Sequence, residues 1–223
     1  MKINKIIKSN IVKKEGLVTT VAVILSCIVL AVVFPAENLF QILTIMLVFL
    51  VILPILYIKG ILKRDVKDFG LSVGDPKAGF IWVALGYILF GLLIYGAIMY
   101  TNIESDYKEL IFIKRSFATF VVYYMGIGVT MIMTEFFFRG FVLNYLKEIF
   151  LKKYYAIFAQ AIIFFIFVSM FERFSFDWNV VFQLIVTLFA GVIAYKSRSI
   201  VYSYLFSLIV IIILGVSIIK VGY

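Results

Sequence analysis

The chain has 223 residues, of which 65% are apolar and 15% are charged, and its mean hydropathy is +1.14. Soluble domains are about 45–50% apolar and about 25% charged, so the composition excludes a soluble globular domain as well as a disordered chain. Lys and Arg number 21 against 12 Asp and Glu, which gives a net charge of +9. Because the basic residues lie between long apolar runs, they indicate membrane topology and not a nucleic-acid partner.

Seven apolar runs are long enough to cross a bilayer core, which takes about 17–25 residues. They predict an all-α, multi-pass transmembrane helical bundle that forms one domain over residues 17–223, after a basic N-terminal segment over residues 1–16. We expect the fourth run to continue as a helix through Phe141–Phe150, because only Gly140 interrupts it. The predicted spans are Leu17–Phe34, Leu39–Ile58, Gly79–Tyr100, Ser116–Phe138, Tyr154–Phe171, Trp178–Tyr195 and Ile200–Ile219.

The distribution of basic residues between these spans predicts the orientation in the lipid bilayer. With the N-terminus in the cytoplasm, the cytoplasmic segments carry fifteen Lys and Arg and the opposite segments carry five. Cytoplasmic loops of membrane proteins are rich in Lys and Arg, so we expect the N-terminus inside and the C-terminus outside a bacterial cell membrane. The five basic residues on the opposite side are Lys108, Lys114, Arg115, Arg173 and Lys220.

Two features of the composition restrict the chemistry. The chain has no histidine, which removes Ser-His-Asp and Cys-His catalysis and zinc sites built on imidazole. Its one cysteine, Cys27, lies inside an apolar run and cannot form an intramolecular disulfide. Any enzymatic mechanism must therefore work without imidazole.

Glu135 and Arg139 are the ionisable residues that stand out within the spans. Such groups are costly in a membrane and mark functional sites by default. Their i, i+4 spacing places both on one helix face, with the acid N-terminal to the cation. The alternative is structural: the pair anchors the helix end at the interface, and the Arg139 side chain snorkels toward the headgroups.

The residues around this pair resemble a known motif. The segment Thr134-Glu135-Phe136-Phe137-Phe138-Arg139-Gly140 is similar to the Glu-Glu-x-x-x-Arg motif of the CAAX protease and bacteriocin-processing family, also called the Abi family. This family consists of multi-pass intramembrane proteins. Its members include enzymes that trim prenylated CAAX proteins and bacterial proteins linked to bacteriocin maturation or self-immunity.

Two downstream motifs of the family, each containing a histidine, are present only in substituted form. Phe165 matches the family phenylalanine, and Ser169 stands at the first histidine position. Ser207 stands at the second histidine position, and Ile211 replaces the asparagine that follows it. With Asp68-Phe69-Gly70-Leu71 included, the resemblance covers residues 68–211.

The departures from the family pattern predict a loss of catalysis. The resemblance implies that the first glutamate activates a water and that the histidines hold a metal or stabilise an oxyanion, but Thr134 replaces that glutamate here. A threonine hydroxyl is a poor general base, and neutral serines are weak metal ligands. We therefore expect no cofactor and a family metal site that is lost, with Glu135 and Arg139 kept as vestiges of the motif.

The resulting hypothesis is a pseudoenzyme that acts by binding a bacteriocin-like peptide or a membrane protein partner. One alternative is an active intramembrane endopeptidase that uses Glu135, and another is a transporter subunit. For Ser169 and Ser207 the structural alternative is hydrogen bonding between helices or close packing. For Thr134 it is a bond back to its own helix.

Overall fold

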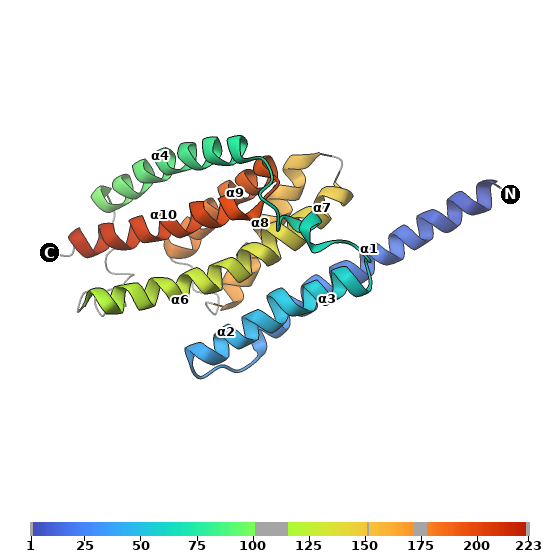
Figure 1. Ribbon diagram of the computed structural model, residues 1–223, viewed down its shortest axis with the longest axis horizontal. Coiled ribbons are helices and arrows are strands. Elements are labelled where there is room, and N and C mark those ends of the chain that lie inside the picture. The colour runs from blue at the N-terminus through green and yellow to red at the C-terminus, as the bar shows by residue number, and fades with distance from the viewer. Residues whose placement is uncertain (1, 101–115, 151, 172–177, 222–223) are drawn as a thin grey trace.

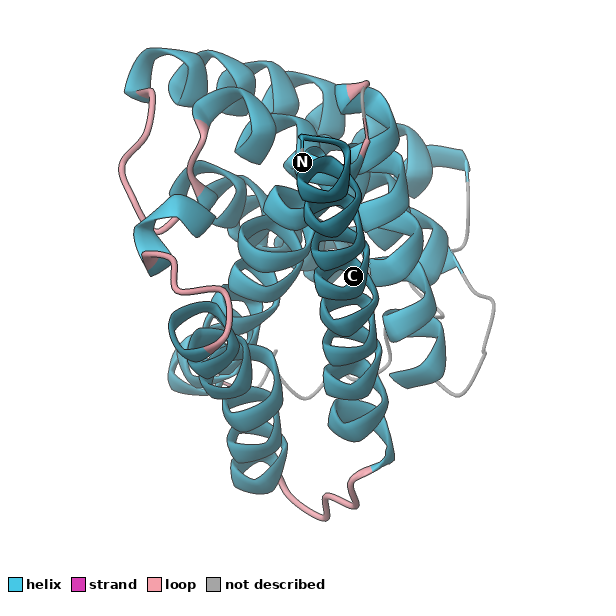
Figure 2. Ribbon diagram, turned by 90° about the vertical axis from the view of Figure 1, so that its right-hand side faces the viewer, coloured by secondary structure: helices cyan, strands magenta, loops and turns pink. Residues whose placement is uncertain are grey.

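The structure is a computed structural model that describes residues 2–100, 116–150, 152–171 and 178–221. Its described residues form helices joined by loops and contain no strand (Figures 1 and 2). The helices are α1 (Lys2–Val33), α2 (Leu39–Leu47), η1 (Val48–Ile52), α3 (Leu53–Gly60), η2 (Val66–Phe69), α4 (Pro76–Tyr100), α6 (Phe117–Glu135), η4 (Phe136–Val142), α7 (Leu143–Ile149), α8 (Lys153–Phe171), α9 (Trp178–Ser197) and α10 (Ile200–Val221).

The predicted all-α membrane bundle is confirmed. Six helical stretches of the described residues are long and apolar enough to cross a membrane, and Val181–Ser197 within α9 is a shorter apolar helix. Many large apolar side chains are exposed on the outer faces of these helices, as expected where lipid and not water surrounds the protein. The chain is therefore a multi-pass membrane protein.

The bundle has two parts that meet along the central polypeptide segment formed by α6, η4 and α7. On one side α4, α9 and α10 pack against one another, and α8 packs along α9. On the other side α1 and the broken helix α2–η1–α3 contact α6, η4 and α8 (Figure 1). The predicted continuation of the fourth span is confirmed, because the helix runs on through η4 and α7 to Ile149.

Two π-helical turns interrupt these helices, each next to a residue that explains it. η1 ends two residues before Pro54, which has no N–H to donate and whose ring would clash with the carbonyl four residues earlier. η4 contains Arg139 and Gly140, and the Asn144 side chain donates to the Gly140 carbonyl at 2.6 Å. Short π-helical turns are frequent at functional sites.

The segment between α3 and α4 is fastened to the turn between α9 and α10. The N–H of Ile200 donates to the Gly70 carbonyl at 3.0 Å, and the N–H of Asp75 donates to the Ser197 carbonyl at 2.7 Å. Gly70 has a φ of 88°, a left-handed conformation that favours glycine. This segment therefore holds the start of α10 against α7 and η4.

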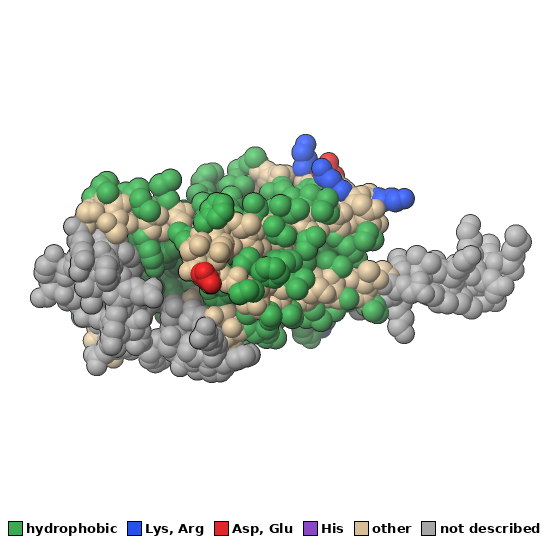
Figure 3. All heavy atoms as spheres, turned by 90° about the horizontal axis from the view of Figure 1, so that it is seen from below, with side chains coloured by type: hydrophobic (Ala, Val, Ile, Leu, Met, Phe, Trp, Pro, Cys, Tyr) green, Lys and Arg blue, Asp and Glu red, His purple; other side chains and the backbone are tan. Residues whose placement is uncertain are grey.

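Basic side chains gather at one end of the apolar body, the end from which α1 extends (Figure 3). This asymmetry agrees with the predicted orientation, which stays a prediction. The opposite-side residues Lys108, Lys114, Arg115 and Arg173 lie outside the described residues, as does the Lys220 side chain.

Candidate functional site

Glu135 and Arg139 form a buried ion pair in the middle of the bundle. The Glu135 side chain is at the end of α6 and Arg139 is one turn later in η4, with exposed fractions of 1% and 3%. Arg139 Nη1 lies 3.6 Å from Glu135 Oε1. The structural alternative, in which Arg139 snorkels to the interface, is wrong because the Arg139 side chain is 3% exposed and is paired with Glu135 inside the bundle.

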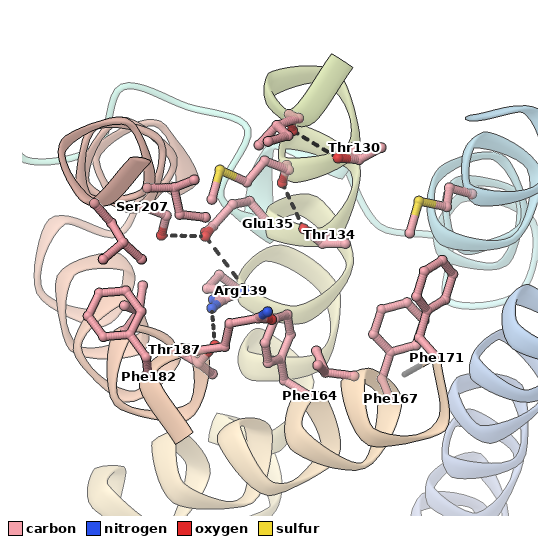
Figure 4. Close-up of a pocket in the computed structure, with 18 of the residues that line it drawn as sticks. Thr130, Thr134, Glu135, Arg139, Phe164, Phe167, Phe171, Phe182, Thr187 and Ser207 are labelled. Carbon is pink, nitrogen blue, oxygen red and sulfur yellow. Dashed lines mark hydrogen bonds and ion pairs between the residues drawn. The ribbon is translucent and has the colours of Figure 1, made fainter. Parts of the chain in front are cut away.

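Two serines of α10 hold the Glu135 carboxylate from the other side. Ser203 Oγ donates to Oε2 at 2.6 Å. Ser207 Oγ donates to Oε1 at 3.0 Å (Figure 4). Because the two serines are four residues apart, their hydroxyls lie on one face of α10, one turn from each other. Each carboxylate oxygen thus has a hydroxyl donor, and Oε1 also faces the guanidinium.

Arg139 is held by α8 and α9. Its Nη2 donates to Thr187 Oγ1 at 2.9 Å, and its Cζ lies 4.7 Å from the centre of the Phe164 ring, a distance at which the ring face attracts a cation. The Glu135–Arg139 pair and its partners therefore connect four parts of the bundle, which are the continuous helix α6–η4 and the helices α8, α9 and α10. Burying a charge in a membrane requires such partners, because an unpaired ion there is strongly destabilising.

The structure brings together some of the residues singled out in the sequence and separates others. Glu135, Arg139 and Ser207 are in one contact network. Thr134 lies beside them, but its Oγ1 donates to the Met131 carbonyl at 2.9 Å, the bond to its own helix that the structural alternative expects. Ser169 is 3% exposed, and its Oγ has no hydrogen-bond partner within the described ranges.

A cavity of about 310 Å³ lies against this network. The ion pair, Thr187 and Ser207 form one end of it, and Ile211 is also in its wall (Figure 4). Most of the remaining wall is aromatic, formed by Tyr123, Tyr124, Phe164, Phe167, Phe171 and Phe182. The cavity is therefore largely apolar with a charged but internally neutralised end, which suits an apolar ligand that carries few polar groups.

The cavity extends from the ion pair away from the basic end of the bundle. Its wall follows α6 back from Glu135 to Tyr123, about 18 Å along the helix axis, and follows α10 forward to Gly215. Tyr123 and Phe171 at the far end are 36% and 43% exposed, whereas Glu135 and Arg139 are buried.

The groups around Glu135 are a poor donor set for a metal ion. They comprise one carboxylate, serine and threonine hydroxyls, and a guanidinium 3.6 Å from the carboxylate oxygen. Catalytic zinc takes three protein ligands such as imidazole, thiolate or carboxylate. In the part of the chain that the structure describes, no three His, Cys, Asp or Glu residues lie together in such a group.

Two contact residues, Ser203 and Thr187, were not assigned a role from the sequence. The signal for Ser203 was its spacing of four residues from Ser207, which places both hydroxyls on one face of a helix. For Thr187 the sequence offers nothing that pairs it with Arg139. Contacts between helices depend on their packing register, which local sequence does not encode.

The fold and this site define a polytopic helical membrane protein with a buried Glu–Arg pair beside an apolar cavity. Residues 115–213 match the family described as type II CAAX prenyl endopeptidase Rce1-like. The family resemblance recognised from the sequence is thereby confirmed over this part of the chain, which contains the whole contact network. For residues 68–114 the family resemblance stays a prediction. No curated protein and no solved structure matches the chain significantly.

Proposed function

We propose that this protein is a catalytically degenerate relative of the CAAX proteases that binds an apolar peptide segment in a bacterial cell membrane without cleaving it. The ligand is a membrane-active, bacteriocin-like peptide or a membrane segment of a partner protein. In the first case binding protects the cell that makes the protein, and in the second it retains the partner.

The observation that carries this proposal is the state of the Glu135 carboxylate. A general base needs a lone pair directed at its substrate water and a proton affinity near that required at neutral pH. Both oxygens of Glu135 accept hydrogen bonds from serines, and Arg139 neutralises its charge. These three contacts occupy both oxygens of the carboxylate, so the group serves better as a structural anion than as a catalyst.

The hydroxyl groups near Glu135 also support binding without cleavage. Thr134 is bonded to its own helix, and Glu135, which accepts the hydrogen bond from Ser207, is already paired with Arg139. A serine nucleophile requires an adjacent base that removes its proton. We extend the proposal to cofactors: the site takes no metal, because its ligand set is hydroxyls and one already neutralised carboxylate.

The shape of the cavity supports a ligand from the non-cytoplasmic side. With the basic end in the cytoplasm, the aromatic wall leads from the ion pair toward the opposite leaflet. Apolar and aromatic walls bind apolar side chains through buried area, and the neutralised ion pair forms the inner end. A membrane-active peptide that inserts from outside would enter by that route.

Reconstituted vesicles test binding and cleavage together. One probe is a photoreactive apolar peptide of about 20 residues, long enough to span the bilayer, and the second is a farnesylated CAAX-type peptide. We expect the first probe to label the wild-type cavity, and we expect mass spectrometry to find both probes intact. Cleavage of either probe that disappears in Glu135→Gln would establish the alternative, an active endopeptidase.

A matched pair of tryptophan substitutions locates the binding site. Ile211 lines the cavity, whereas Ile209 on the same helix is 37% exposed toward lipid. Ile211→Trp fills the cavity and should reduce photolabelling at least fivefold, while Ile209→Trp should leave it unchanged. Equal labelling of the two variants would mean that the probe binds elsewhere and would refute the cavity as the binding site.

A further inference from the structure

Tyr124 of α6 carries a hydroxyl group that the contact network around Glu135 does not use. The side chain is 7% exposed and forms part of the cavity wall. Its ring centre lies 4.6 Å from that of Phe120 and 5.4 Å from that of Tyr123, and these two rings fix its orientation. In the part of the chain that the structure describes, its hydroxyl makes no hydrogen bond. Buried tyrosine hydroxyls usually have a hydrogen-bond partner, so this group is available to a ligand of the cavity.

Gly215 of α10 determines where this hydroxyl lies. A Cβ at position 215 would overlap the Tyr124 hydroxyl oxygen, so only glycine leaves room for it. Gly215 is itself part of the cavity wall. The Tyr124 ring therefore crosses from α6 to α10 at the cavity. Its oxygen keeps accessible surface there, unlike unpaired atoms such as Ser169 Oγ, which are fully enclosed.

The position of Tyr124 along α6 gives the cavity a second polar point. Tyr124 precedes Glu135 by three helical turns, which is about 16 Å along the helix axis. At the inner end the Glu135 carboxylate already accepts hydrogen bonds from two serines, whereas the Tyr124 hydroxyl has a proton to donate. In a largely apolar cavity a few polar groups fix the orientation of the ligand, so a free donor restricts what binds.

We propose that Tyr124 is a specificity-determining residue of the cavity and that its hydroxyl donates a hydrogen bond to a backbone carbonyl oxygen of the bound peptide. This inference rests on the proposed function, in which the cavity binds an apolar peptide segment. The last four carbonyls of a helix have no partner within the helix, and lipid offers none. A peptide whose helix ends about 16 Å from the ion pair therefore presents an acceptor to Tyr124.

Photolabelling by the apolar peptide probe in vesicles measures the contribution of the hydroxyl. Tyr124→Phe keeps the ring and removes only the oxygen, and we expect the apparent affinity for the probe to fall about three- to tenfold. Tyr202→Phe is the matched control, because Tyr202 is 4% exposed but is not part of the cavity wall. Its affinity should equal that of the wild type. Equal affinity of Tyr124→Phe and the wild type would overturn the inference.

Thermal midpoints with and without the peptide separate ligand binding from a structural role. In maltoside micelles without peptide, Tyr124→Phe removes an unpaired hydroxyl, so the midpoint should stay constant or rise. Saturating peptide should then raise the midpoint of Tyr124→Phe less than that of the wild type, because the variant binds it more weakly. A fall in the absence of peptide would mean that the hydroxyl has a partner within the protein, and this result would overturn the inference.

Two further comparisons complete the test. Without peptide, we expect the wild type and Tyr124→Phe to differ equally in vesicles of ester-linked and of ether-linked phosphatidylcholine. A fall of the Tyr124→Phe midpoint only in the ester-linked vesicles would assign the carbonyl to a lipid and overturn the peptide assignment. If Ile211→Trp reduces photolabelling and Tyr124→Phe does not, the inference fails while the proposed function stands. If the wild-type cavity is not labelled at all, the proposed function fails, and the inference fails with it.

Discussion

The hydrogen bond from Ser203 to the Glu135 carboxylate gives the sharpest test of the site. Ser203→Ala deletes a hydroxyl that lies 2.6 Å from Oε2 and is 0% exposed. A hydrogen bond to a charged group contributes about 1.5–3 kcal/mol. For a chain of this size 1 kcal/mol corresponds to a shift of about 2–4 °C in the thermal midpoint, so we expect a fall of about 3–12 °C.

Ser169→Ala is the matched control. Ser169 is equally buried, but its hydroxyl has no hydrogen-bond partner in the described part of the chain. Removing an unpaired buried hydroxyl costs no hydrogen bond and relieves its desolvation, so the midpoint should stay constant or rise slightly. The two variants make the same chemical change at two buried serines, of which Ser203 bonds Glu135 and the Ile200 carbonyl and Ser169 bonds no described group.

The single cysteine of the chain provides the assay. Cys27 is 2% exposed, so a thiol-reactive dye labels it only when the bundle opens, and the labelling curve gives the midpoint in micelles. Repeating Ser203→Ala in a Glu135→Gln background completes a double-mutant cycle, in which the loss should shrink because the charged acceptor is gone. An unchanged midpoint in Ser203→Ala, or an equal fall in Ser169→Ala, would refute the assignment of Ser203 as a partner of the carboxylate.

Three further predictions concern the pair, the helix contact and the topology. Arg139→Met and Glu135→Leu should each lower the free energy of unfolding by about 3–5 kcal/mol, because each leaves a buried charge unpaired. The double variant should lose less stability than either single variant, and the unfolding midpoints of the three variants check this. Gly140→Ala should lower the thermal midpoint, because its Cβ would lie 2.7 Å from a backbone carbonyl oxygen. Gly91→Ala should not lower it, because no atom lies within 4 Å of the added Cβ. Equal effects of the two substitutions would contradict the packing at Gly140. Lys63→Cys in a cysteine-free background should react with an impermeant maleimide only after cells are permeabilised, and labelling of intact cells would reverse the predicted orientation.

The bundle could be predicted from the sequence because its signals are local. Apolar runs of sufficient length define the spans, and the structure contains helices at all seven positions. The first helix begins at Lys2, fifteen residues before the predicted Leu17, because it includes the basic N-terminal segment. The π-helical turn η4 was not predicted, because a change of hydrogen-bond pattern within a helix leaves no trace in hydropathy. Its position follows from contacts such as that of Asn144 with the Gly140 carbonyl.

The candidate site could be predicted only in part. The i, i+4 spacing of Glu135 and Arg139 predicts that they share a helix face, and the structure pairs them at 3.6 Å. The sequence left two interpretations of Arg139 open, a buried partner and an interfacial anchor, because hydropathy places it near the end of a span. The contacts of its guanidinium with Phe164 and Thr187 show that Arg139 is a buried partner.

The sequence by itself thus determined what each segment is: apolar helices, a basic end, a family motif and the absence of imidazole. Tertiary structure alone decided which polar side chains meet. Ser203 and Ser207 lie 68 and 72 residues from Glu135 along the chain, yet donate to the same carboxylate, whereas Ser169, closer in sequence, makes no hydrogen bond to it. The physical reason is that hydropathy and helix periodicity act within one helix, while contacts between helices depend on the rotation and register with which whole helices pack.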